Sequence, residues 1–348
     1  MKVLIVKLSS LGDVVHAMPA VQDIRAAFPL VQIDWVVERG FAPLVARCEG
    51  VGRVIPCELR RWRKAPFSAA TRSAWGSFKA DLQREAYDAV IDLQGLSKSA
   101  LVAWLARLAP AGKRYAMANR TEGSSYEAPT RWVADVAVPM VAHSHAVVRG
   151  RALCAQALGY ALEGQNSPKN MRFGLLPLVE SMQGATENVA NSAVQSPCVA
   201  FIHGTSRDDK CWPEAHWLAL GQRLLDAGYL IALPHGSAEE LARSERLAQA
   251  LGPGATVWPR CDLGALTDRL AACAGVIGVD SGLSHIAVAL GLPHVQIYNF
   301  DTAWRTGPLP TDTGDAPVRQ CSVYAQPVPS LNAVWEAWQR VTDTPGKP

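Results

Sequence analysis

The chain alternates short apolar runs with segments of helical spacing, and it does so in two separate series. In the first half, the predicted strands are 2–6, 32–37, 54–56 and 89–92, and the predicted helices are 14–28, 71–85 and 97–108. Strands that alternate with helices form βαβ units, whose strands pair in parallel. This half therefore predicts an α/β domain with a mostly parallel sheet.

A second series of the same kind begins at residue 198. Its predicted strands are 198–203, 229–233, 256–258, 275–279 and 294–298, and its predicted helices are 213–227, 238–251, 263–274 and 282–290. A length of 348 residues fits two domains of about 100–200 residues each. We predict an N-terminal domain at 1–165, a polar linker at 166–197, a C-terminal domain at 198–328, and a C-terminal helix and tail at 329–348.

Composition excludes several classes of protein. With 49% hydrophobic and 19% charged residues the chain is not disordered, and a net charge of +3 gives little support to a nucleic-acid partner. The eight cysteines are scattered without metal-site spacing, so we expect reduced thiols in the cytoplasm. Lys7 closes the first apolar run, and no run approaches the ~18–20 apolar residues of a membrane span, so we expect neither a signal peptide nor a transmembrane segment.

The loop after the first predicted strand carries a carboxylate, Asp13, beside the start of a helix. Ligands of open α/β sheets bind at the carboxyl ends of the strands. A carboxylate there can accept a proton from a bound hydroxyl, but the same residue can also cap the helix. Its position alone leaves both interpretations open.

Three loops of the second half suit a phosphate or a sugar. Ser281 and Gly282 begin a predicted helix, whose amino terminus attracts anions, and Asp280 precedes them. A second loop supplies the hydroxyls of Thr205 and Ser206 and the cation Lys210. A third loop supplies acids, of which Glu240 is the candidate. Each loop is weak evidence when taken singly, because capping also explains Asp280 and Ser281, favourable first-turn helix charge also explains Glu240, and His285 can be a core histidine. Together they indicate a nucleotide diphosphate ligand.

Basic residues concentrate in the first half. The run 53–64 holds five cations and one acid, and the candidates for contact with an anionic partner are Arg60, Arg61, Arg63, Lys64, Lys98 and Arg120. Arginine suits carboxylates and phosphates, although a solvated basic face is the alternative. His143 and His145 have the spacing of metal ligands, but no further ligands accompany them, so we predict no metal site.

Four motifs occur together in an order that resembles the ADP-heptose lipopolysaccharide heptosyltransferases of Gram-negative bacteria. They are Lys7-Leu-Ser-Ser-Leu-Gly-Asp13, Leu59-Arg-Arg-Trp-Arg-Lys64, Asp92-Leu-Gln-Gly-Leu-Ser-Lys98 and Val279-Asp-Ser-Gly-Leu-Ser-His285. The resemblance covers nearly the whole chain and is weakest across 160–197. The last motif marks the wider family, and the run that ends at Lys64 is typical of the members that add the first heptose.

The resemblance implies a GT-B architecture, in which two Rossmann-like domains with mostly parallel sheets face a central cleft. It implies inverting transfer of L-glycero-D-manno-heptose from ADP-heptose to Kdo of the lipid A inner core, with no required cofactor; dependence on a divalent cation stays open. The acceptor implies a cytoplasmic protein that works peripherally at the inner membrane.

The resemblance also assigns roles by motif. Asp13 becomes the general base. Thr205, Ser206 and Lys210 contact the diphosphate with the backbone of Ser281 and Gly282, Asp280 and His285 face the heptose or its phosphate, and Glu240 faces the ribose. Arg60, Arg61, Arg63, Lys64, Lys98 and Arg120 face Kdo and the lipid A phosphates. Two positions depart from the pattern: Cys261 replaces a methionine near the adenine, and Ser281 replaces a threonine.

Three alternatives remain. A transferase of the second heptose shares the donor site. A nicotinamide-dependent oxidoreductase suits two Rossmann-like halves, but neither first strand is followed by G-x-G-x-x-G. A non-catalytic nucleotide-sugar-binding protein is the third.

Overall fold

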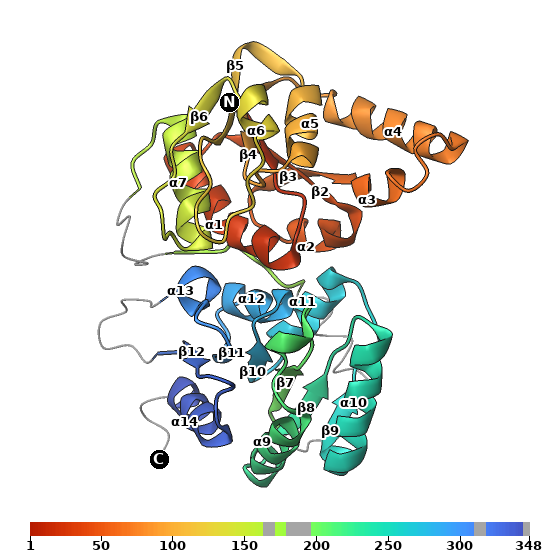
Figure 1. Ribbon diagram of the computed structural model, residues 1–348, viewed down its shortest axis with the longest axis vertical. Helices are drawn as coiled ribbons and strands as arrows, with labels where there is room; N and C mark the ends of the chain where they lie inside the picture. The colour runs from red at the N-terminus through yellow and green to blue at the C-terminus, as the bar shows by residue number, and fades with distance from the viewer. Residues whose placement is uncertain (163–170, 179–195, 310–317, 344–348) are drawn as a thin grey trace. The chain divides into compact units, whose positions relative to one another are not determined.

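The computed structural model describes residues 1–162, 171–178, 196–309 and 318–343 (Figure 1). These residues form two compact units. The first contains 1–162 and 172–175, and the second contains the other described residues. The predicted linker at 166–197 lies largely outside the described residues. Within the described part of the chain, no helix is both long and apolar enough to cross a membrane.

The first unit is a six-stranded sheet in the order β3-β2-β1-β4-β5-β6, and every pair is parallel. The strands are β1 (Lys2–Val6), β2 (Gln32–Glu38), β3 (Val51–Cys57), β4 (Tyr87–Asp92), β5 (Leu108–Met117) and β6 (Val136–Val138). The helices are α1 (Leu11–Ala27), α2 (Ala42–Val45), α3 (Leu59–Trp62), α4 (Ala69–Leu82), α5 (Ser97–Leu105), α6 (Pro129–Val133) and α7 (Ala146–Leu158).

The second unit repeats this plan, with a parallel sheet in the order β12-β11-β10-β7-β8-β9. The strands are β7 (Cys198–Ile202), β8 (Leu230–Leu233), β9 (Ala255–Val257), β10 (Gly275–Val279), β11 (His294–Tyr298) and β12 (Gln320–Tyr324). The helices are α9 (Glu214–Asp226), α10 (Ala238–Leu251), α11 (Leu263–Ala271), α12 (Gly282–Ala289), α13 (Ala303–Thr306) and α14 (Leu331–Thr342).

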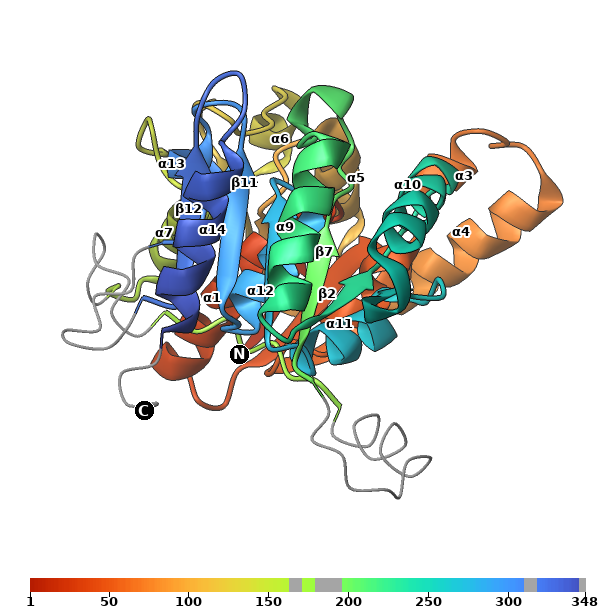
Figure 2. The same cartoon turned by 90° about the horizontal axis from the view of Figure 1, so that it is seen from below.

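The core of each unit lies on the central strands of its sheet. The apolar residues of β1 and β10 are fully buried, because helices cover both faces of a parallel sheet. The C-terminal helix α14 joins the second core through Val334, Trp338 and Val341, and it lies beside α9 (Figure 2). A Cβ at Gly275 would meet the Trp338 ring at 2.7 Å, so a glycine there lets α14 pack against the start of β10.

The predicted fold class is confirmed, whereas several individual elements were wrong or missed. Strands 2–6, 275–279 and 294–298 and helix 238–251 have the predicted bounds. The helix predicted over 97–108 ends at Leu105, and the chain then forms β5. The strands β5, β6 and β12 and the helix α7 were not predicted. Pro110, Gly112 and two cations make β5 a poor strand sequence, and its pairing with β4 decides its conformation.

Candidate functional site

Each sheet has a switch point where the strand order reverses, between β1 and β4 in the first unit and between β7 and β10 in the second. Loops that leave the carboxyl ends of two such strands diverge and open a crevice for a ligand. The loop at 7–10 and the segment 93–96 follow β1 and β4, while the segments at 203–210 and 280–281 follow β7 and β10. The predicted Asp13 loop and two of the three predicted phosphate loops therefore lie at the switch points of their units.

Asp13 is held at the start of α1 by the loop that precedes it. Ser10 is the N-cap residue, and its backbone N–H and its hydroxyl donate to Asp13 Oδ2 at 3.0 and 2.9 Å. Lys7 Nζ lies 3.7 Å from Asp13 Oδ1. The Asp13 side chain is nevertheless 40% exposed. Asp13 therefore takes part in capping α1 as the third helical residue, whereas Ser10 is the N-cap, and its partial exposure leaves the carboxylate accessible.

The surroundings of Asp13 favour its ionised form. Burial raises its pKa, but the charge of Lys7, the hydrogen bonds from Ser10 and the charge of Arg149 together hold the pKa below its ordinary value. The carboxylate is therefore ionised at neutral pH and able to take a proton from a bound hydroxyl.

Two of the six predicted cations converge on the Asp13 loop. Lys98 Nζ donates to Ser9 Oγ at 2.9 Å, and an Arg60 nitrogen lies 3.4 Å from the same oxygen. Burial and the charge of Arg60 lower the pKa of Lys98. The other four do not gather there: Arg61 pairs with Glu58 at 3.1 Å, and the remaining three, Arg63, Lys64 and Arg120, are exposed.

Several polar residues beside Asp13 were missed by the sequence reasoning. Gln94 Oε1 accepts the N–H groups of Leu8 and Ser9 at 3.1 and 3.0 Å, and so ties the loop after β1 to the loop after β4. Lys7, His16 and Arg149 line a small hollow with Asp13. Lys7 directly follows the first strand, which was an available clue, whereas Gln94 and Arg149 reach the site only through the fold.

Asp92 anchors the loop after β4 from within the core. Its Oδ1 accepts the N–H groups of Gln94 and Gly95 at 2.9 and 3.1 Å, and its Oδ2 accepts the Ser99 hydroxyl at 2.9 Å. Burial is the largest influence on this carboxyl and raises its pKa to about 6. The folded chain therefore binds a proton at Asp92 more tightly than the unfolded chain does.

We expect Asp92→Asn to remove a pH-dependent loss of stability. A carboxyl whose pKa is raised by folding adds to the free energy of unfolding below about pH 4. This contribution, here on the order of 3 kcal/mol, is lost as the pH rises through about 6. Asparagine can keep the bonds to Gln94 and Gly95 but cannot ionise. The free energy of unfolding of the first unit, measured in the full chain with urea between pH 4.5 and 8, should depend less on pH in the variant than in the wild type. Parallel pH profiles would contradict the expectation.

Asp280 is the centre of the second site. It directly follows β10, and Lys210 Nζ donates to its Oδ2 at 2.6 Å. His285 Nε2 lies 3.6 Å from Oδ1, and the Thr205 hydroxyl donates to the Asp280 carbonyl at 3.1 Å. Burial raises the pKa of Asp280, but His285 and Lys210 bring it well below its ordinary value. Four of the predicted donor-site residues are thus in one cluster.

The start of α12 supplies hydrogen-bond donors for an anion beside this cluster. Ser281 is the N-cap residue of α12, and its buried hydroxyl oxygen has no hydrogen-bond partner among the described residues. Gly282 is the first helical residue, so the free N–H groups of the first turn begin here. A Cβ at Gly278 would lie 2.7 Å from that of Ile202, so glycine there permits the close packing of β10 against β7.

Glu240 extends this second site toward β8. It lies in the first turn of α10, where the Ser237 hydroxyl accepts its N–H at 3.2 Å. Its Oε2 accepts the Gly236 N–H at 2.6 Å, and a Cβ at Gly204 would come within 2.2 Å of its Oε1. The carboxylate therefore lies between the loops that follow β7 and β8. Ser206 is exposed on the first of these loops.

Asn299, which the sequence reasoning missed, supports the Lys210 loop. It follows β11, and its Nδ2 donates to the carbonyls of Asp209 and Cys211 at 3.1 and 3.0 Å. Cys261 follows β9 and is partly exposed, and burial raises the pKa of its thiol.

No metal-binding group of three or more histidines, cysteines and acids occurs in the part of the chain that the structure describes. The histidine pair that suggested metal spacing has other contacts. His145 is the N-cap residue of α7 and accepts the Val147 N–H at 3.2 Å, and its ring lies edge-on to that of His16.

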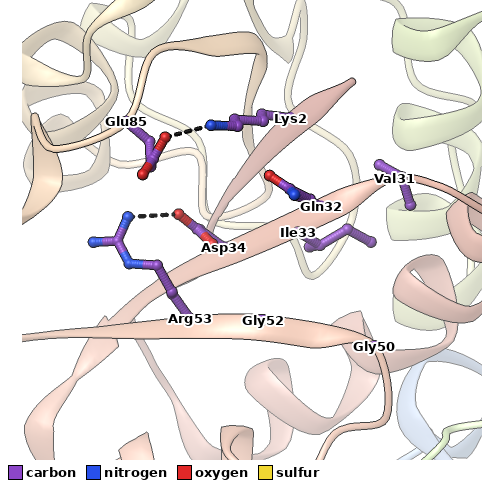
Figure 3. Close-up of a pocket in the computed structure, with 9 residues that line it drawn as sticks. All are labelled: Lys2, Val31, Gln32, Ile33, Asp34, Gly50, Gly52, Arg53 and Glu85. Atoms are coloured by element: carbon purple, nitrogen blue, oxygen red, sulfur yellow. Dashed lines mark hydrogen bonds and ion pairs between the residues drawn. The ribbon is translucent and has the colours of Figure 1, made fainter.

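A larger pocket, of about 360 Å³, lies at the opposite, amino-terminal edge of the first sheet (Figure 3). Its charged side chains are paired with one another: Lys2 with Glu85, and Arg53 with Asp34 at 3.0 Å. The Tyr87 hydroxyl also donates to Asp34 at 2.7 Å. Because these charges are paired within the protein, we assign them to stabilisation of this sheet edge rather than to a ligand.

Comparisons with known proteins identify relatives that match most of the chain. The family glycosyltransferase family 9 (heptosyltransferase) matches residues 75–321. Lipopolysaccharide heptosyltransferase 1 of Pseudomonas aeruginosa is 40% identical over 308 residues, which are 88% of this chain and 81% of that protein. Lipopolysaccharide heptosyltransferase 2 of Escherichia coli is 26% identical over 320 residues, 89% of this chain and 86% of that protein.

Two solved structures have the same fold. Escherichia coli heptosyltransferase WaaC with ADP matches 97% of this chain and 98% of its own, at a TM-score of 0.81 and 34% identity. The same enzyme with ADP-2-deoxy-2-fluoro heptose matches with the same coverage and identity, at a TM-score of 0.76.

Proposed function

The chain belongs to glycosyltransferase family 9, the heptosyltransferases, and we propose that it transfers L-glycero-D-manno-heptose from ADP-heptose to Kdo of the lipid A inner core. The observation that carries this proposal is that each unit has a polar site at its switch point. In the first unit the Asp13 carboxylate lies near the cations Arg60 and Lys98, and in the second unit Lys210 and hydroxyls lie near the amino terminus of α12. Greater identity to heptosyltransferase 1 than to heptosyltransferase 2 supports addition of the first heptose.

The second unit binds ADP-heptose in this proposal. The first turn of α12, at Ser281 and Gly282, and the side chains of Thr205, Ser206 and Lys210 hold the diphosphate. The unpaired hydroxyl of Ser281 supports this placement, because a buried polar atom without a partner is costly unless a ligand completes it. Glu240 accepts a ribose hydroxyl, and Asp280 and His285 face the heptose or its phosphate. Because the cysteine side chain is smaller than that of methionine, Cys261 fills less of the proposed wall near the adenine.

The first unit binds the acceptor. The carboxylate of Kdo lies against Arg60 and Lys98, whose charges already meet at Ser9 beside Asp13. Arg61, Arg63, Lys64 and Arg120 are the proposed contacts of the lipid A phosphates. This acceptor is part of a membrane, so we propose that the protein is cytoplasmic and works at the face of the inner membrane.

Asp13 acts as the general base of a single displacement. It removes the proton of a Kdo hydroxyl while that oxygen forms a bond to the anomeric carbon of the heptose. The bond from that carbon to the ADP oxygen breaks on the opposite face, so the configuration inverts. Lys210 and the α12 amino terminus stabilise the charge that develops on ADP. The proposal requires no cofactor.

Release of ADP tests this function and its rivals. We expect ADP release from ADP-heptose with Kdo-bearing lipid A, and much slower release with the same acceptor that already carries its first heptose. Faster release with the heptose-bearing acceptor would favour the second-heptose enzyme. Tight ADP-heptose binding without release under either condition would favour the non-catalytic binding protein, and a nicotinamide absorbance change would favour an oxidoreductase.

A further inference from the structure

One face of the helix α10 meets the loop that follows β7. Arg243 and Ser244 follow Glu240 by three and four residues, so the three side chains share a face of the helix. The Ser244 hydroxyl is buried and lies 2.8 Å from Nε2 of His203, the first residue after β7. We call residues 203–211, which include three of the proposed diphosphate contacts, the β7 loop.

The Arg243 side chain joins the two ends of the β7 loop. Its Nη1 donates to the His203 carbonyl at 3.1 Å and to Cys211 Sγ at 3.4 Å. His203 is the first residue of the loop and Cys211 is the last, so a single guanidinium nitrogen closes the loop at its base. A loop whose ends are held close together has fewer conformations open to it.

Lys210 directly precedes the anchored end of the β7 loop. Arg243 holds the Cys211 thiol, and Asn299 Nδ2 donates to the Cys211 carbonyl at 3.0 Å. The backbone beside Lys210 is therefore held both by α10 and by the segment that follows β11. These contacts fix the point at which the flexible lysine side chain leaves the loop.

Arg243 is held by neutral groups and not by an acid. Its partners are a carbonyl and a thiol, and the described residues place no carboxylate within ion-pair distance of it. Glu214 pairs instead with Arg246, at 2.8 Å. Burial, and then the charge of Arg243, lower the pKa of His203 to about 4, so the His203 ring is neutral at neutral pH. The charge of Arg243 is thus not neutralised by these contacts, and it favours an anion at the β7 loop.

We propose that Arg243 is a positioning residue for the diphosphate of the donor. By closing the β7 loop it keeps Thr205 and Lys210 in the places where they meet the diphosphate, without touching the substrate itself. In its absence the loop samples other conformations, and the affinity for ADP falls in proportion to the fraction that remains competent to bind. The inference rests on the proposed function in that the β7 loop binds the diphosphate of ADP-heptose.

Calorimetric titration with ADP tests this role in the full chain. Arg243→Met keeps an apolar stem but removes both hydrogen bonds, so the dissociation constant of ADP should rise about tenfold. Arg243→Lys should raise it about threefold, because an ammonium can keep one of the two bonds but not the geometry of both. Wild-type affinity for ADP in either variant would overturn the proposal.

Arg246 provides the matched control on the same helix. Its exposed guanidinium pairs with Glu214 outside the β7 loop, so Arg246→Met should leave the dissociation constant of ADP within about twofold of the wild-type value. A loss in Arg246→Met equal to that in Arg243→Met would assign both effects to the charge or stability of α10, and the proposal would fail.

A double-mutant cycle with Lys210→Met distinguishes positioning from a structural role. If Arg243 acts by placing Lys210, Arg243→Met should raise the dissociation constant of ADP by less than about threefold once Lys210 is already absent. An equal loss of affinity with and without Lys210 would show that the two residues act independently, which contradicts the proposal.

Binding of ADP also separates this role from the proposed function. If the wild type binds ADP but transfers heptose to no acceptor, the proposed function fails, while the titrations still decide the role of Arg243. If the wild type does not bind ADP, both fail.

Discussion

Asp13→Asn is expected to lower kcat for heptose transfer by about 10²–10⁴-fold, the usual contribution of a positioned general base. Asparagine can still accept the Ser10 hydrogen bonds through its side-chain oxygen, so the start of α1 should keep its structure. It cannot take the proton of the acceptor hydroxyl. Because the donor-binding residues lie in the other unit, the dissociation constant of ADP-heptose should stay within about twofold. ADP release and calorimetric titration measure the two quantities.

A second carboxylate of α1 provides the control for this substitution. Asp23 accepts two hydrogen bonds from Arg151, at 2.6 and 3.1 Å, and has no contact with the Asp13 loop among the interactions described above. Asp23→Asn should keep the wild-type kcat, whatever it costs in stability. Near-wild-type turnover by Asp13→Asn, or an equal loss in both variants, would remove Asp13 from the role of base.

Lys210→Met is expected to lower kcat/KM for ADP-heptose by about 10²–10³-fold, as loss of one preorganised donor at a leaving group does. Lys210 supplies the cation at the proposed diphosphate site, and its bond to Asp280 also orders the loop. Without it, the buried Asp280 carboxylate loses one of its two described ion-pair partners and keeps His285. The affinity for ADP should fall as well, which titration with ADP alone measures.

A neighbouring cation controls for simple loss of charge. Arg207 is exposed and pairs with Asp209 on the same loop, so Arg207→Met should change kcat/KM by less than about threefold. Lys210→Arg should recover part of the activity, because it restores the charge but not the geometry. Wild-type affinity for ADP in Lys210→Met would place the diphosphate elsewhere.

The sequence predicted which loops leave the carboxyl ends of the strands, because strands and helices alternate along the chain. Asp280 directly follows β10, and Asp13 lies in the first turn of α1, after the loop that follows β1. Their roles as base and as donor contact came from the family resemblance and stay proposals. Buried strands such as β1 and β10 were found because continuous apolar runs mark them.

The order of strands within each sheet could not be predicted. Most contacts of the site depend on that order, so they could not be predicted either. Lys210 and Asp280 are 70 residues apart and meet because β10 pairs with β7. Gln94 reaches the Asp13 loop because β4 pairs with β1. For the same reason, composition could not tell that Arg60 and Lys98 meet at Ser9 while Arg61 pairs with Glu58.

The configuration of the product tests the central claim most directly. The protein is incubated with ADP-heptose and Kdo-bearing lipid A, and the new glycosidic linkage is assigned by NMR. A single displacement with Asp13 as base predicts one heptosyl unit on Kdo, with the anomeric configuration opposite to that in ADP-heptose. A product with the donor's configuration, or with heptose on a sugar other than Kdo, would contradict it.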